Sequence, residues 1–139
     1  MESQIIDITR AIQLAVAPVF LLTALATLIS ALNTRLGRIV DRRRAVEGQD
    51  NSGPQAQAEL VLLQRRTHLI YRAILAAVAG GLLVCLVVVV AFIGALIAID
   101  LARLVAILFI LALLAFIASL GFFLQEIFLV VQDKGRIIR

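Results

Sequence analysis

The chain has no tryptophan, one cysteine, one histidine and two prolines among its 139 residues. The single cysteine (Cys85) excludes a disulfide within the chain. Together with the single histidine (His68), it also excludes a metal site built from several thiolates and imidazoles. Charged residues make up 16% and hydrophobic residues 63%, whereas typical soluble domains have about 25% and about 45–50%. This composition excludes a disordered chain and indicates a membrane protein.

Three charge-poor stretches are long enough to cross a bilayer, for which about 20 apolar residues are needed. They run from about 11 to 34, from 73 to 99 and from 104 to 131, and only the third contains a charge, Glu126. Backbone groups must be paired inside hydrocarbon, and none of the stretches alternates with a period of two, so all three are expected to be helices. The expected fold is all-α, a single membrane domain with three transmembrane helices.

The basic residues are distributed unevenly along the chain. Eight of the 13 lie between the first and second apolar stretches, and the C-terminal tail adds Lys134, Arg136 and Arg139. Basic segments are retained on the cytoplasmic side of a membrane. We therefore expect the N-terminus to lie outside, and the long connection and the C-terminus to lie in the cytoplasm.

The connection of residues 35–72 is predicted to be a cytoplasmic helical hairpin. Leu36, Ile39 and Val40 continue the helical spacing of the first stretch, and apolar residues at helical spacing resume after residue 55. Residues 48–54 are rich in turn-forming types and end in a proline, which is suited to the start of a helix. The first two membrane helices are thus expected to extend together beyond the membrane.

Polar residues in the first stretch follow one helical stripe. Thr23, Thr27, Ser30 and Thr34 are spaced four, three and four apart, which places them on one face of a helix. Further residues extend this candidate pore lining in both directions: Gln13, Val16, Phe20, Arg38 and Asp41. Three helices cannot enclose a water path, so a pore needs a ring of identical subunits whose hydroxyls partly replace an ion's water shell. In the competing interpretation, the hydroxyls bond to their own helix or hold neighbouring helices together.

Small residues offer two faces for close helix packing. Ala17, Ala24 and Ala31 recur at heptad spacing in the first stretch. In the second stretch, Gly80 and Gly81 each follow an alanine four residues earlier, a pattern that lets membrane helices approach closely. These glycines are therefore expected to serve packing.

Glu126 lies near the end of the third stretch, where an unpaired charge facing lipid is costly. It is expected to face protein and to pair with Arg65, Arg66 or Arg72, which reach the same level of the membrane. Such a pair either locks the third helix to the hairpin or responds to protons or ions when an arginine moves away.

Other polar residues suggest contacts with lipid rather than chemistry. The clustered Arg42, Arg43 and Arg44 are candidates for binding anionic lipid headgroups at the cytoplasmic face. Nucleic-acid binding is not expected, because no aromatic residues alternate with the basic ones. His68 and Cys85 lie at different depths and cannot form a nucleophile and its base. We expect no enzyme activity and no cofactor.

Two runs in the chain, LISALNTRLGRIVDRRRAV (residues 28–46) and AELVLLQRRTHLIYRAI (residues 58–74), resemble the bacterial family known as domain of unknown function 2721. Members of that family are small three-span membrane proteins with an arginine-rich helical hairpin, and FFLQEI (residues 122–127) fits the same layout. The resemblance implies the three-span fold and a location in the bacterial cytoplasmic (inner) membrane. It implies no activity, substrate or catalytic residue.

Two functions follow from these patterns. The first is a small homo-oligomeric ion channel whose first helix lines the pore. The alternative is a non-conducting scaffold or regulatory protein whose basic hairpin binds anionic lipids or a partner protein. The sign of the ion stays open, because Arg35 and Arg38 near the inner mouth favour anions whereas Asp41 favours cations. Subunit number and gating stimulus stay open too.

Overall fold

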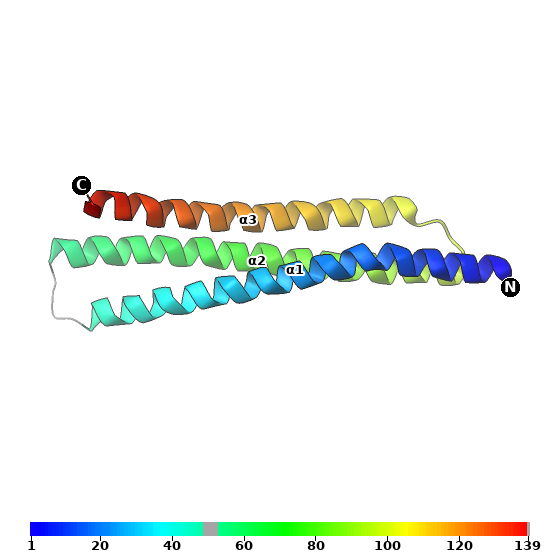
Figure 1. The fold of residues 1–139 in the computed structure, drawn as a ribbon, viewed down its shortest axis with the longest axis horizontal. Coiled ribbons are helices and arrows are strands. Elements are labelled where there is room, and N and C mark those ends of the chain that lie inside the picture. Colours follow the sequence, from blue (N-terminus) through cyan, green and yellow to red (C-terminus); the bar gives the residue numbers. More distant parts are fainter. Residues whose placement is uncertain (49–52, 139) are drawn as a thin grey trace.

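The computed structural model describes residues 1–48 and 53–138, and it shows three long helices lying side by side (Figure 1). They are α1 (Glu2–Glu47), α2 (Pro54–Ile97) and α3 (Ala102–Ile138), and the described residues contain no strand. Each helix includes a stretch long and apolar enough to cross a membrane. The N-terminus and the α2–α3 connection lie at one end of the molecule, and the C-terminus lies at the other (Figure 1). The described part of the protein is therefore all-α, with three helices that are long and apolar enough to span a membrane.

Each helix is longer than the apolar stretch that it contains. The first stretch lies within the 46 residues of α1, which starts at Glu2 and continues through the arginine cluster to Glu47. The second begins within α2, which has 44 residues and starts at Pro54, but α2 ends at Ile97, so the predicted end at 99 is two residues too far because Ala98 leaves the helical conformation. The third lies within the 37 residues of α3. The turn expected at 48–54 falls between α1 and α2, and its residues 49–52 lie outside the described part of the chain.

A seven-residue repeat of buried positions runs along the helices. In α2, Ala73, Gly80 and Val87 are buried, and a second buried set repeats at the same spacing. The repeat in α1 comprises Ala11, Pro18, Leu25, Leu32, Ile39 and Val46; in α2 the second set comprises Leu63, Ile70, Ala77 and Val84; in α3 it comprises Ala112, Ser119 and Glu126. This is the spacing of left-handed coiled coils, in which helices stay in contact along a continuous seam by winding gently around each other. The seam explains how three rods without a globular core hold together.

The central helix α2 packs against both of its neighbours. One buried cluster joins Leu32 and Ile39 of α1 to Leu63 and Ile70 of α2. A second cluster, nearer the middle of the apolar stretches, includes Leu25 of α1 and also Ala77, Val84 and Ala112. Burial is otherwise sparse, and most apolar side chains outside the seam are exposed. That distribution suits a protein whose outer surface meets lipid rather than water.

Gly80 lies where α2 and α3 approach each other closely. A Cβ atom at this position would lie 3.4 Å from the Ala112 carbonyl oxygen and 3.5 Å from the Ala115 Cβ. The packing role expected for Gly80 is therefore observed. The face of Ala17, Ala24 and Ala31 is exposed instead, and no other helix of the protomer covers it.

The α2–α3 connection is short and closed by local hydrogen bonds. Ala98 adopts a left-handed conformation with φ 56°, and the Ile99 N–H donates to the Gly94 carbonyl. The Asp100 carboxylate then accepts a hydrogen bond of 3.1 Å from the Ala102 N–H, capping the first turn of α3. This turn brings α3 back antiparallel along α2.

Candidate functional site

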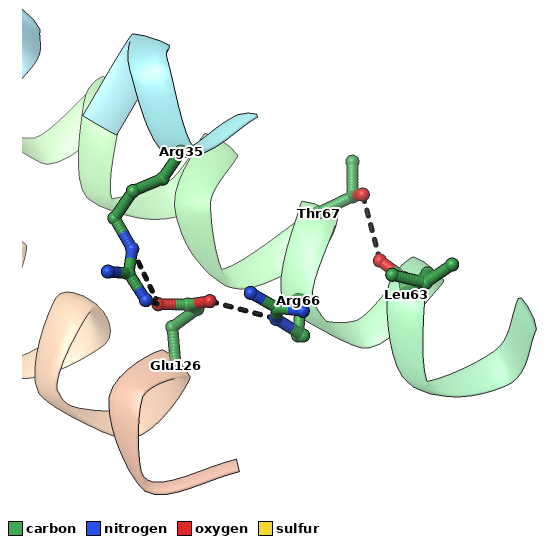
Figure 2. A network of polar contacts seen from close by, with 5 residues as sticks. All are labelled: Arg35, Leu63, Arg66, Thr67 and Glu126. Carbon is green, nitrogen blue, oxygen red and sulfur yellow. Dashed lines mark hydrogen bonds and ion pairs between the residues drawn. The ribbon is translucent and has the colours of Figure 1, made fainter. Parts of the chain in front are cut away.

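A buried carboxylate joins all three helices near one end of the seam. Glu126 of α3 has no exposed surface. Arg35 of α1 donates to its Oε2 atom from Nε at 3.0 Å and also from Nη2, and Arg66 of α2 donates to Oε1 from Nε at 2.9 Å. Figure 2 shows the carboxylate pointing from α3 between the two guanidinium groups. Each oxygen of Glu126 thus binds a different helix.

The triad carries a net positive charge, which its surroundings accommodate. Two guanidinium groups face one carboxylate, which leaves a net charge of +1, and the Arg35 and Arg66 side chains are 33% and 22% exposed. The guanidinium carbon of Arg35 also lies 5.2 Å from the centroid of the Phe123 ring, in cation–π distance. Among the described residues, no buried side-chain nitrogen or oxygen lacks a hydrogen-bond partner. The arrangement is saturated and suits a structural lock.

From the sequence, Glu126 is expected to form an ion pair within the protein, but only one of its two partners is among the expected arginines. Of the three arginines expected to pair with it, Arg66 does so, whereas Arg65 and Arg72 are exposed and border a groove beside the triad. Arg35 is the partner that sequence reasoning missed. Its position offered a signal, because it lies three residues after Leu32 and four before Ile39, next to the buried seam of α1.

Ser119 provides a second polar contact between helices, one heptad before Glu126. Its buried Oγ donates a hydrogen bond of 2.7 Å to the Ala73 carbonyl oxygen of α2. Together with the pair between Arg66 and Glu126, this bond sets the register of α3 against α2. Thr67, drawn in Figure 2, instead donates to the Leu63 carbonyl of its own helix at 2.8 Å.

The hydroxyl stripe lies on the side of α1 facing away from the seam. Each helical residue turns the chain by about 100°, so positions two and five after a seam residue lie roughly 200° and 140° away from it. Thr27 and Ser30 occupy those two positions after Leu25. Every candidate pore-lining residue on this face is exposed: Gln13, Val16, Phe20, Thr23, Thr27, Ser30, Thr34, Arg38 and Asp41.

Three hydroxyls of the stripe bond to their own helix. Thr23, Thr27 and Thr34 donate to the carbonyl four residues earlier, at 3.2, 2.9 and 3.0 Å. A carbonyl can only accept, so each of these hydroxyl oxygens keeps its lone pairs for a further partner. At these three positions the face of α1 therefore presents acceptor oxygens, whereas Gln13 and Arg38 on the same face carry N–H donors.

Two of the three arginines assigned to lipid headgroups have acidic partners. Arg42 donates to Glu59 of α2 at 2.7 Å, and Arg43 donates to Glu47 at 3.1 Å. The hydrogen bond to Glu59, with the attraction of its charge, raises the pKa of Arg42 above its usual value. Within the described residues, Arg44 forms no ion pair.

Two grooves open between the helices at opposite ends of the molecule. One, of about 830 Å³, lies near the N-terminus and the α2–α3 connection; it is mostly apolar, and Asp7, Arg10 and Gln13 are among its polar residues. The other, of about 580 Å³, lies between α2 and α3 beside the triad, and Arg65 and Arg72 border it. Across the described residues, no group of three His, Cys, Asp or Glu side chains could hold a metal ion.

Comparison with known proteins identifies a family. A family model described as a protein of unknown function (DUF2721) matches residues 15–134, a range that includes the triad and every candidate pore-lining residue except Gln13. No curated protein and no solved structure matches the chain.

Proposed function

The chain belongs to the DUF2721 family of proteins of unknown function, and we propose from its own geometry that it is a homo-oligomeric membrane ion channel with α1 lining the pore. The observation that carries this proposal is the position of the hydroxyl stripe directly opposite the seam. Neither α2 nor α3 covers that face within the protomer. Sister copies can cover it, and polar side chains there favour a polar shared axis over contact with acyl chains.

The hydroxyl geometry favours cations as the conducted ions. The hydroxyls of Thr23, Thr27 and Thr34 donate hydrogen bonds to backbone carbonyls, so the atoms available to an ion are hydroxyl oxygens with lone pairs. Such oxygens replace the water shell of a cation. Of the two arginines that by sequence favoured anions at the inner mouth, Arg35 is paired with Glu126. Arg38 stays exposed on the stripe, with Asp41 three residues later as its opposite charge. Asp41, exposed on the same face of α1, adds a carboxylate to the path.

In this proposal the triad of Arg35, Glu126 and Arg66 is structural. Because both carboxylate oxygens accept from arginines on different helices, the triad fixes the rotation of α1 relative to α2 and α3. That rotation decides which face of α1 is presented to sister copies. The proposal places the N-terminus outside and the arginine-rich ends of α1 and α2 in the cytoplasm, in keeping with their basic charge.

No catalytic role is part of the proposal. His68 and Cys85 are the residues most suited to nucleophilic chemistry, and they lie 17 positions apart on the same helix, which separates them by about 25 Å. A base must lie within hydrogen-bond distance of its nucleophile.

A non-conducting scaffold is the second candidate, and one observation favours it. The three threonine hydroxyls already donate hydrogen bonds to their own backbone. The stripe can therefore face acyl chains, and no polar axis between subunits is needed to pair it. The basic ends of α1 and α2 would then bind anionic lipids or a partner protein.

Ion flux from liposomes separates the two candidates. Purified protein is reconstituted at fixed density, and K⁺ release is compared for the native chain, Thr27→Leu and the control Cys85→Leu, which alters an exposed position on α2. We expect flux from the native chain, a fall of at least about tenfold for Thr27→Leu because a leucine ring dewets the axis, and no change for the control. Absence of flux from the native chain favours the scaffold. Equal flux from Thr27→Leu and Cys85→Leu would show that the hydroxyl stripe does not line the pore.

A further inference from the structure

The α2–α3 groove, bordered by Arg65, His68, Arg72, Gln125 and Gln132, has the chemistry of a ligand site that the proposed channel does not use and that the scaffold candidate does not locate within the basic ends of the helices. On α2, the three basic side chains are spaced three and four apart and share one face. All three are exposed. In the described part of the chain, neither Arg65 nor Arg72 forms an ion pair, in contrast to Arg66 on the adjacent face.

The wall contributed by α3 complements these charges with neutral donors and apolar surface. Gln125 and Gln132 are seven residues apart, so their amides lie on one face of α3. Leu69 and Phe128 supply the apolar part of the lining. With Gln64 of α2, the described lining residues comprise two guanidinium groups, an imidazole, three amides and apolar side chains, and none of them is a carboxylate. An anion with an attached apolar portion fits that combination.

The depth of the groove matches that of a lipid headgroup. The charge-free part of α2 begins at Ala73, immediately after Arg72. The hydrogen bond from Ser119 to the Ala73 carbonyl places the following residues of α3 level with the basic part of α2. The groove therefore lies at the membrane boundary, where phospholipid phosphates are found.

The surface next to the groove continues as an apolar track into the membrane. Seven and fourteen residues after His68, on the same face of α2, come Leu75 and Leu82. Their side chains are 69% and 64% exposed. An acyl chain can lie along this track while its phosphate remains at the arginines, whereas free phosphate gains nothing from it.

From these observations we propose that the α2–α3 groove binds an anionic phospholipid, with its phosphate between Arg65, His68 and Arg72. Arginine forks hold phosphate oxygens by paired, charge-assisted hydrogen bonds. The Gln125 amide donates to the same headgroup from α3. The bound lipid bridges α2 and α3 beside the triad, and it does so whether or not the protein conducts ions.

The test counts bound lipid on the full chain in detergent by native mass spectrometry, with phosphatidylglycerol and phosphatidylcholine as probes. The variant Arg65→Gln/Arg72→Gln is compared with Arg10→Gln/Arg103→Gln, which removes the same number of exposed charges outside the groove. We expect phosphatidylglycerol affinity to fall at least about tenfold for the groove variant and less than about twofold for the control. Gln125→Leu, which keeps every charge, is expected to weaken binding several-fold.

Three results would overturn the proposal. Equal losses in both double variants would show diffuse attraction by surface charge. Equal affinity for the two lipids would show that the headgroup charge is not recognised. Full displacement of phosphatidylglycerol by millimolar inorganic phosphate would assign the groove to the free anion. The elution profile of each variant in detergent micelles verifies that it is folded.

Discussion

At the scale of single residues, Glu126 shows how a buried charge becomes acceptable in a membrane protein. An isolated carboxylate in hydrocarbon is costly, and its cost is offset only by well-aligned partners. Here both oxygens accept from guanidinium groups, and the arginines remain partly exposed, so their hydration is only partly lost. Removal of the carboxylate would leave two arginines close together without a counter-charge.

We therefore predict that Glu126→Gln destabilises the protein strongly. The expected cost is about 2–3 kcal/mol, below the roughly 3–5 kcal/mol of a fully buried pair, because Arg35 and Arg66 can regain water. The measurement is the temperature at which the monodisperse peak in size-exclusion chromatography is lost after heating in detergent. Glu59→Gln, which breaks the exposed pair with Arg42, is the control and is expected to leave that temperature unchanged.

At the scale of helices, the seven-residue repeat determines which faces meet. The seam places one residue per two turns of α1 against α2, and small residues in α2 and α3 let those two helices approach closely. Van der Waals packing of this kind is the main source of helix association in lipid, where burial of apolar surface gives little gain. The packing of α2 against α3 is thus more sensitive to a larger side chain at position 80 than the apolar surroundings of Gly80 suggest.

Gly80→Leu is predicted to separate α2 from α3. A side chain there has no space against the Ala112 carbonyl and the Ala115 Cβ, and overpacking of this kind costs about 1–3 kcal/mol. Gly121→Leu on α3 is the matched control, since nothing lies within 4 Å of a Cβ at that position. Heat stability in detergent is expected to fall for the first variant only. Equal stability of the two would mean that α2 and α3 are farther apart than described.

At the scale of the whole molecule, the described part of a protomer is a thin bundle of three helices, too few to enclose a water path. Most of its apolar surface faces outward, including the alanine face of Ala17, Ala24 and Ala31 beside the hydroxyl stripe. Small residues permit close approach by another copy. Self-association through α1 would bury this face and bring the hydroxyl oxygens of several chains together.

Cysteine cross-linking in membranes tests that assembly. On a Cys85→Ser background, Ser30→Cys is expected to form covalent dimers with a short thiol-reactive linker, because the stripes of sister copies meet. Leu82→Cys, on an exposed face of α2, is the control and is expected to remain monomeric. Dimers that form equally at both positions would indicate random collisions in the membrane, and dimers at neither would contradict self-association through α1.

The sequence by itself was sufficient for the number of spans, their helical nature, the packing role of Gly80 and the expectation that Glu126 faces protein. These properties follow from local quantities, namely the length of apolar runs, the spacing of side chains and the cost of a charge in lipid. The sequence did not determine that Glu126 pairs with Arg35 and Arg66 rather than with Arg65 and Arg72. Arg35, Arg65 and Arg66 lie at similar depth and Arg72 about 9 Å further along α2, so the sequence leaves the choice to the rotation and register of the helices.

That rotation is decided by tertiary structure, because it depends on how three heptad seams interlock along their length. The register between Ser119 and Ala73 and the pair between Arg66 and Glu126 together align α3 with α2. With the seam aligned, Arg65 and Arg72 are turned into the α2–α3 groove and the α1 hydroxyls away from the bundle. Composition and periodicity determine what each helix is, whereas contacts between residues distant in the chain determine which way it faces.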